Sequence, residues 1–261
     1  IAEKIAEGSD ALKKKMASTI KLAQKIEKES KKLTQDLLDK NQLTFEDKKQ
    51  IEQLLAKQKE LEKAVKEIKA QNEKNNFDKQ ENTALTDELK EKQKQIDNLF
   101  NNILNEKTQE LLKKLQQLME LNNKDLTKEG LSKMQMDNKS LKNELDRILE
   151  LYKQLEFEQS LQNKIDRLED LAKQQKELSE QSKTQQAPIE ELKKRQEDLN
   201  KEFKLLQKEL EKLDEKNQEL EKPNAFENPE KETAEIEKTQ KDSKEDLNKN
   251  DKQKAAQKQQ K

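Results

Sequence analysis

Residues 188–221 carry an apolar repeat whose spacing alternates between three and four residues without interruption. Such a repeat places one narrow apolar stripe, here called a seam, along an α-helix that packs against another helix. Pro188 suits the first turn of this helix, and Pro223 follows its end. We therefore predict a heptad coiled coil over residues 188–221. Its seam residues are Ile189, Leu192, Gln196, Leu199, Phe203, Leu206, Leu210, Leu213, Asn217 and Leu220.

Two further seams occupy the N-terminal part of the chain. Segment 9–41 places apolar or small residues from Leu12 to Leu37 at helical spacing, and segment 44–75 does the same from Ile51 onward. Thr44 and Asp47 have the spacing of a capping box, with the acid three residues after the cap. A short connection therefore separates two helices of similar length.

The middle of the chain gives a less regular pattern. Segments 80–122 and 137–183 both have helical spacing of leucine and isoleucine. Between them lies the short piece 125–135, which contains one glycine, and breaks are expected on either side of it, at Asn122-Asn123-Lys124 and at Met136-Asp137. Asp137 is then the expected N-cap of the following helix.

The seam of segment 137–183 changes phase between Leu155 and Phe157. A shift of this kind locally alters the packing direction of a coiled-coil helix. The polar run 182–186 predicts the end of that helix before Pro188.

Composition excludes a broad globular core. The chain has 261 residues, of which 43% are charged and 29% hydrophobic, with two glycines and three prolines. Ordinary globular domains are nearer half apolar and a quarter charged. Long helices that share narrow seams are compatible with this balance, so the predicted fold class is all-α.

Residues 222–261 differ from the rest because their seam disappears. Ile236 and Leu247 are isolated among lysine, glutamate, asparagine and glutamine. Too little apolar surface remains to offset the entropy of ordering the chain. We therefore predict a disordered charged tail over residues 222–261.

The helices can form one extended rod or fold back on themselves. In a parallel homodimer of 188–221, the residues that flank the seam would give one attractive, one repulsive and two neutral pairs between the two chains, so their charges do not specify this arrangement. A buried Asn217 is compatible with pairing to itself in such a dimer. In the N-terminal segments the apolar stripe is wider than a two-stranded seam requires, which favours more than one helical neighbour. The widening residues are Ile20, Leu22, Leu55 and Ala64. Matched segment lengths also favour antiparallel hairpins, with a helical hairpin over 1–75 and a long helical coiled-coil region over 76–183.

The sequence predicts no catalytic, cofactor-binding or metal-binding residue. Histidine and cysteine are absent, and no glycine-rich phosphate loop is present. Carboxylate pairs such as Glu156 with Glu158 and Glu190 with Glu191 are expected on solvated helix surfaces, where nothing shifts their pKa toward catalysis. We predict no small-molecule ligand and no cofactor.

The charge balance bears on partners. There are 55 basic and 56 acidic residues, and the two signs are interspersed. A surface of this kind has no strong field to attract nucleic acid or an anionic membrane. No run approaches the roughly 20 apolar residues that span a bilayer. The expected partners are proteins, or other copies of the chain, bound through helix seams, with membrane contact only through segments outside this sequence.

One stretch resembles a known family. Residues 145–158, together with 134–138 and 106–111, are similar to large, uncharacterised membrane-anchored proteins of the Bacteroidota. The resemblance covers roughly residues 30–185. It implies long helical regions rich in lysine, glutamate and glutamine, a membrane anchor outside this chain, and a place at the bacterial cell envelope. It implies no activity for any residue.

These observations favour a non-enzymatic structural or interaction protein that acts as a spacer or docking scaffold. The alternative is the coiled-coil arm of a larger ATPase or motor. A nucleotide-binding head in the parent protein would support the arm, and membrane helices would support the scaffold. The first residue is Ile1 rather than methionine, so we expect the chain to be part of a longer protein.

Overall fold

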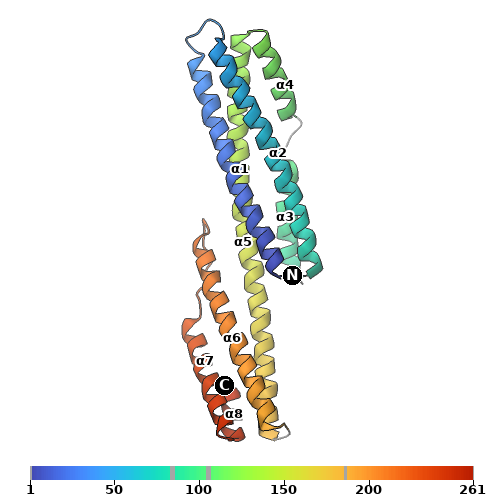
Figure 1. The fold of residues 1–261 in the computed structure, drawn as a ribbon, viewed down its shortest axis with the longest axis vertical. Coiled ribbons are helices and arrows are strands. Elements are labelled where there is room, and N and C mark those ends of the chain that lie inside the picture. Colours follow the sequence, from blue (N-terminus) through green and yellow to red (C-terminus); the bar gives the residue numbers. More distant parts are fainter. Residues whose placement is uncertain (1, 83–85, 104–106, 185–186, 261) are drawn as a thin grey trace. The chain divides into compact units, whose positions relative to one another are not determined.

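The structure is a computed structural model, and within its described residues the chain forms eight helices and no strand (Figure 1). This confirms the predicted all-α fold. The described residues are 2–82, 86–103, 107–184 and 187–260, with side chains described over 7–77, 86–103, 110–184 and 187–260. The helices are α1 (Ala2–Asp36), α2 (Phe45–Asn82), α3 (Asp87–Asn102), α4 (Lys107–Glu120), α5 (Lys124–Thr184), α6 (Ile189–Gln218), α7 (Glu230–Asn248) and α8 (Lys252–Gln259).

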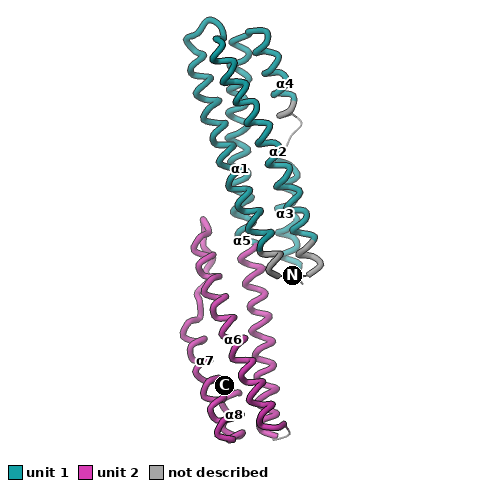
Figure 2. The backbone as a smooth tube through the Cα atoms, viewed as in Figure 1, with its two compact units in different colours: residues 1–155 teal, residues 156–261 magenta. Residues whose placement is uncertain are grey.

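The chain divides into two compact units, Ile1–Leu155 and Glu156–Lys261 (Figure 2). The long helix α5 contributes its first part to unit 1 and its second part to unit 2. This division differs from the predicted segments, because it falls inside the predicted region 76–183 and joins 188–221 to the tail.

In unit 1 the helices α1 and α2 lie antiparallel (Figure 1). The Lys57 ammonium contacts the Glu29 carboxylate at 2.6 Å, and the Asn75 amide donates to the Gly8 carbonyl at 2.9 Å. From the first pair to the second, the residue number falls on α1 and rises on α2, so the two helices run in opposite directions.

The connection between α1 and α2 contains the predicted capping box. The Thr44 N–H donates to the Asp47 carboxylate at 2.9 Å, and the Asp47 N–H donates to the Thr44 hydroxyl at 3.2 Å. Lys40 also contacts this carboxylate, at 2.5 Å. Burial alone raises the pKa of Asp47, but the hydrogen bonds from Lys40 and Thr44 outweigh it, so the pKa is lowered.

The third position of the unit 1 bundle is shared by α3 and α4, and the first part of α5 takes the fourth. The predicted single helix over 80–122 is thus divided, with α3 ending at Asn102 and α4 beginning at Lys107. Part of this junction, residues 104–106, lies outside the described residues. The arrangement is an up-down-up-down bundle of the kind that short connections favour.

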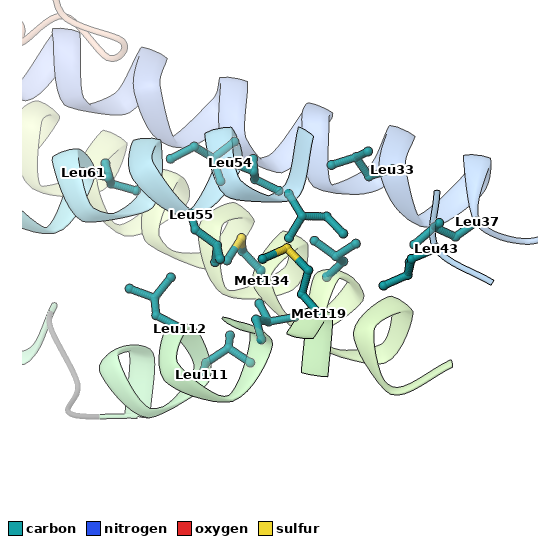
Figure 3. Close-up of a cluster of buried hydrophobic side chains, with 14 of the residues drawn as sticks. Leu33, Leu37, Leu43, Leu54, Leu55, Leu61, Leu111, Leu112, Met119 and Met134 are labelled. Carbon is teal, nitrogen blue, oxygen red and sulfur yellow. The ribbon is translucent and has the colours of Figure 1, made fainter. Parts of the chain in front are cut away.

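Two apolar clusters fill unit 1. One cluster joins α1, α2, α4 and the start of α5, and Figure 3 shows part of it, including Leu55 between α2 and its neighbours. Leu55 is one of the residues that widen the predicted stripe, and it is buried. The other cluster consists of Leu12, Met16, Ile68, Leu89, Ile96, Phe100, Ile148, Tyr152 and Leu155.

The helix α5 runs unbroken from Lys124 to Thr184. The predicted break at Met136-Asp137 is therefore wrong, and Asp137 is an exposed residue inside the helix, not an N-cap. Burial of Met134 and Asn138 holds this stretch in the bundle. The Asn138 amide donates to the Gln58 side chain of α2 at 2.7 Å, which ties α5 to its neighbour.

The phase shift seen in the sequence coincides with the boundary between the units. Leu155 belongs to a core cluster of unit 1, whereas Phe157 belongs to a cluster of unit 2 with Leu213 and Leu220. The change of phase turns the apolar face of α5 from one set of neighbours to another.

In unit 2 the second part of α5 lies antiparallel to α6. The Arg167 guanidinium contacts the Glu209 carboxylate at 2.7 Å, and the side chains of Gln175 and Gln196 exchange hydrogen bonds at 3.0 and 3.1 Å. The predicted seam faces this core, and all its residues except Ile189 are buried.

The prediction of a disordered tail is wrong for the residues that form α7 and α8. Leu247, Ala255 and Ala256 are fully buried, and Leu247 and Ala255 join the core cluster that contains Phe203. Hydrogen bonds add to the small apolar contact area that holds these two helices in unit 2. The Ser179 hydroxyl donates to the Ala256 carbonyl at 2.8 Å.

The two polar seam residues of α6 bind within the chain. The Gln196 amide oxygen accepts from Ser243 of α7 at 3.2 Å and from Gln259 of α8 at 2.9 Å. The Asn217 side chain accepts from the Asn224 backbone N–H at 2.8 Å and donates to its carbonyl at 3.0 Å. Asn217 therefore holds the loop after α6, and the fold uses this side chain for a purpose other than the self-pairing considered from the sequence.

Candidate protein-interaction groove

The sequence predicts no catalytic side chain, so the candidate site is one of protein interaction, on the surface of the folded chain. Among the residues that the structure describes, no group of three or more acidic side chains could hold a metal ion. The shifted carboxylates have structural causes. For example, the pKa of Glu197 is lowered by its hydrogen bonds and ion pairs with Lys201 and Lys244.

A tight turn at residues 121–123 sets α4 and α5 antiparallel in unit 1. Asn122 has a positive φ of 53°, a conformation that asparagine tolerates better than most residues. The Asn123 N–H donates to the Leu118 carbonyl at 3.1 Å. The Asn123 side chain accepts from the Leu126 N–H at 3.2 Å, which caps the start of α5.

Gly130 brings the two helices close together. A Cβ atom at this position would lie 2.4 Å from Cδ2 of Leu115, a distance that a real side chain does not tolerate. Leu115 is fully buried and projects into the space that a side chain at Gly130 would occupy. The glycine, expected to lie between two helix breaks, therefore serves inside a continuous helix as a contact point.

A hollow of about 490 Å³ opens between α4 and the start of α5. Its apolar lining consists of Leu111, Leu115, Leu118 and Leu126, with Gly130 beside them. Leu126 is 44% exposed, so part of this apolar surface is in contact with solvent. Leu121 in the adjoining turn is 77% exposed. We call this hollow the α4–α5 groove.

Four charged side chains border the α4–α5 groove, Glu110 and Lys114 on α4 and Glu129 and Lys133 on α5. All four are exposed, and none forms an ion pair within the described part of the chain.

The contact of Leu115 with Gly130 fixes the relative level of the two borders. In an antiparallel pair, Lys114 then lies within about two residues, or roughly 3 Å, of the level of Glu129, and Glu110 lies equally close to that of Lys133. Opposite charges thus alternate both along each helix and across the groove.

A second hollow, of about 360 Å³, lies between α2 and α3 in unit 1. Its polar groups largely bind one another: one Asp97 oxygen accepts from Asn72 and Asn76 at 2.7 Å and from Gln93 at 3.2 Å. The amide oxygens of these three side chains are buried without a partner in the described residues, which adds a desolvation cost. Burial lowers the pKa of Lys69, whose ammonium donates to the Asn101 carbonyl at 3.1 Å. This cluster joins two helices and offers less to a partner than the α4–α5 groove.

Sequence reasoning missed the α4–α5 groove because its residues fall on both sides of a predicted break. Leu126 lies outside every predicted seam, and Gly130 lies between two predicted breaks. The available signal was the glycine itself, since a glycine within a helical run often marks a close approach of another segment.

None of the described helices contains a stretch apolar enough to cross a membrane. Comparisons of the chain with family models, with curated proteins and with solved structures find no match.

Proposed function

We propose that this chain is a non-enzymatic structural and interaction protein, a helical scaffold that docks an amphipathic helix of a protein partner in the α4–α5 groove. The observation that carries the proposal is the hollow lined by Leu111, Leu118 and Leu126, in which Leu126 is 44% exposed to solvent. An amphipathic helix that lays its apolar face into such a groove is a common mode of protein recognition.

The lining has the chemistry of a helix-binding surface. Contacts with its leucines favour burial of an apolar surface but do not fix the direction of the partner helix. The charged borders would select the register and orientation of that helix. The partner would present apolar side chains at intervals of three and four residues, with charges flanking them. A helix of this kind is abundant in coiled-coil proteins.

The rest of the chain supports a role as a spacer. Both units consist of helices with buried seams and charged outer surfaces. The resemblance of residues 106–111 and 134–158 to membrane-anchored proteins of the Bacteroidota supports a place at a bacterial envelope. In that case the anchor would belong to sequence outside this chain.

Site-specific photo-crosslinking tests the proposal. A crosslinking amino acid at position 133, on the border of the groove, is expected to give an adduct with a defined protein in cells that produce this protein. The same amino acid at position 32, an exposed site on α1, serves as the matched control. The change Leu126→Glu should abolish the adduct at position 133, because it places a charge in the apolar lining.

The partner identified in this way is then purified and titrated against the chain. Specific docking predicts saturable binding that Leu126→Glu weakens at least tenfold, with the helical content of the chain unchanged. Adducts of equal yield at positions 133 and 32, or binding that is indifferent to Leu126→Glu, would contradict the proposal.

A further inference from the structure

The borders of the α4–α5 groove have an unusual property: they are complementary to themselves. Glu110 and Lys114 alternate along α4, and Lys133 and Glu129 alternate in the opposite sense along α5. The two acids, Glu110 and Glu129, lie at diagonally opposite corners of the groove, and the two bases, Lys114 and Lys133, occupy the other two corners. Only such a diagonal placement sets unlike charges next to each other both along each helix and across the groove.

We propose that the partner in the α4–α5 groove is a second copy of this chain, whose own groove faces the first across a two-fold axis. This inference rests on the proposed function, because it names the partner at the same surface; α4 and α5 of the second copy then cover the groove by packing on its borders. Two-fold dimers use the same patch on both subunits, so the patch has to be self-complementary.

Two directions of the two-fold axis keep the helices of the two copies parallel or antiparallel, and both satisfy this requirement. If the axis is parallel to the helices, α4 lies over α5 of the other copy, and Lys114 faces the partner's Glu129. If the axis is perpendicular to them, α4 lies over α4, and Lys114 faces the partner's Glu110. The remaining two border charges are paired in the same manner, so every border charge faces an unlike charge in both of these arrangements.

The apolar lining supplies attraction, and the charges supply specificity. The exposed part of Leu126, and Leu121 beside it, would be covered in the dimer. The two short faces bury less area than a standard stable interface, so the dimer belongs among weak complexes. We expect a dissociation constant on the order of 10 µM.

Two charge variants of the full chain test the proposal in either orientation. Lys114→Glu with Lys133→Glu makes all four border charges acidic, and Glu110→Lys with Glu129→Lys makes them all basic. Each variant alone should associate at least tenfold more weakly than the unmodified chain. An equimolar mixture of the two should restore association to the unmodified level or above, because every acid then faces a base. Sedimentation velocity measures all three samples.

The matched control is Lys28→Glu with Lys32→Glu, which makes the same change of charge on exposed positions of α1. This variant should dimerise like the unmodified chain. Circular dichroism checks that every variant keeps its helical content.

Two results would overturn the inference: an unmodified chain that stays monomeric to about 100 µM, or charge variants that self-associate as well as the unmodified chain. These results are distinct from failure of the proposed function. If the chain is monomeric while position 133 crosslinks to another protein in a manner that depends on Leu126, the second-copy inference fails and docking of a different helix stands. If both experiments are negative, both proposals fail.

Discussion

Buried polar side chains act in this fold as ties between helices and loops. Gln196 has no exposed surface and contacts both α7 and α8, and Asn217 is 1% exposed and holds Asn224 in the loop after α6. A leucine at either position would suit the apolar seam of α6. It would also leave buried partners without hydrogen bonds, which costs about 1–3 kcal/mol per group.

The change Asn217→Leu is expected to loosen the loop that follows α6. Its side chain would no longer accept from the Asn224 N–H, so hydrogen exchange at Asn224 should accelerate. The oligomeric state should not change, because Asn217 binds within its own chain. Glu215→Leu, which introduces the same residue at an exposed position of α6, serves as the control, with exchange at Asn224 close to that of the unmodified chain. Unaltered exchange in Asn217→Leu would show that this contact does not hold the loop.

Asp47 should make the stability of unit 1 dependent on pH. Its folded-state pKa is lowered below the ordinary value of 3.8. The ionised carboxylate therefore stabilises the fold fully above the unfolded pKa, and this contribution is lost as pH falls through the folded pKa. Asp47→Asn should lower the free energy of unfolding at pH 7 by about 1 kcal/mol, the usual size of a capping interaction.

Urea unfolding of Asp47→Asn and the unmodified chain at pH 7 and near pH 3 measures this effect. The difference between the two proteins should shrink at the lower pH, because protonation of Asp47 then removes part of the stability that its ionised carboxylate contributes, whereas the asparagine of the variant is neutral at both pH values. Asp39→Asn, a change at an exposed carboxylate outside the capping box, should show no comparable difference. A difference for Asp47→Asn that is the same at both pH values would contradict the role assigned to its charge.

At the scale of whole helices, α7 and α8 show how few apolar residues a segment needs in order to dock. Leu247 is their one fully buried large side chain among the described residues, and Ala255 and Ala256 provide close contacts. Hydrogen bonds from Ser179 and Lys252 to backbone carbonyls fix the position of α8. The docking is therefore specific, but it depends heavily on a single leucine.

Leu247→Ala should release α7 and α8 from the rest of unit 2. Removing a fully buried leucine side chain typically costs about 2–5 kcal/mol, which is large for helices with so few other apolar contacts. Hydrogen exchange over 230–259 should accelerate strongly, while exchange in α6 changes less. Ile236→Ala is the control, because Ile236 lies on the same helix α7 but is 41% exposed. Equal effects of the two changes would show that Leu247 is not the anchor.

The sequence made α6 predictable because its seam is regular. Every seam residue from Leu192 to Leu220 is buried, and the capping box of Thr44 with Asp47 is formed by the expected hydrogen bonds. In both cases the information is local, since the spacing of a helix and the chemistry of its cap are properties of neighbouring residues.

Other features depend on packing between distant segments, and local patterns did not indicate them. Gly130 belongs inside α5 because Leu115 needs the space beside it. Leu247 docks because α5 and α6 already offer a surface, with Phe203 among its residues. The α4–α5 groove depends on which leucines remain exposed after packing, so Leu126 could not be distinguished from a core residue by spacing alone.

At the scale of the whole molecule, each unit contains its own core. The two large clusters of unit 1 draw only on residues up to Leu155, and the clusters of unit 2 draw only on residues from Phe157 onward. Units with separate apolar cores can in principle fold separately. The boundary lies within one continuous helix, α5.

The fragment 1–155 is accordingly expected to fold alone. Its circular dichroism should show a helical protein with a cooperative urea transition, because all four positions of its bundle are present. The fragment 1–122 lacks α5 and serves as the contrast, with a broad transition or none, since the clusters of unit 1 lose residues such as Tyr152. If 1–155 behaves like 1–122, the two units depend on each other for stability.

The alternating border charges of the α4–α5 groove have a consequence for the conditions under which it can act. Dissolved ions screen these exposed charges, because the screening length falls from about 30 Å at 0.01 M to about 10 Å at 0.1 M. The contacts made by this face therefore respond to ionic strength. Dilution of the surrounding electrolyte would strengthen whatever contact it makes, and osmotic concentration would weaken it.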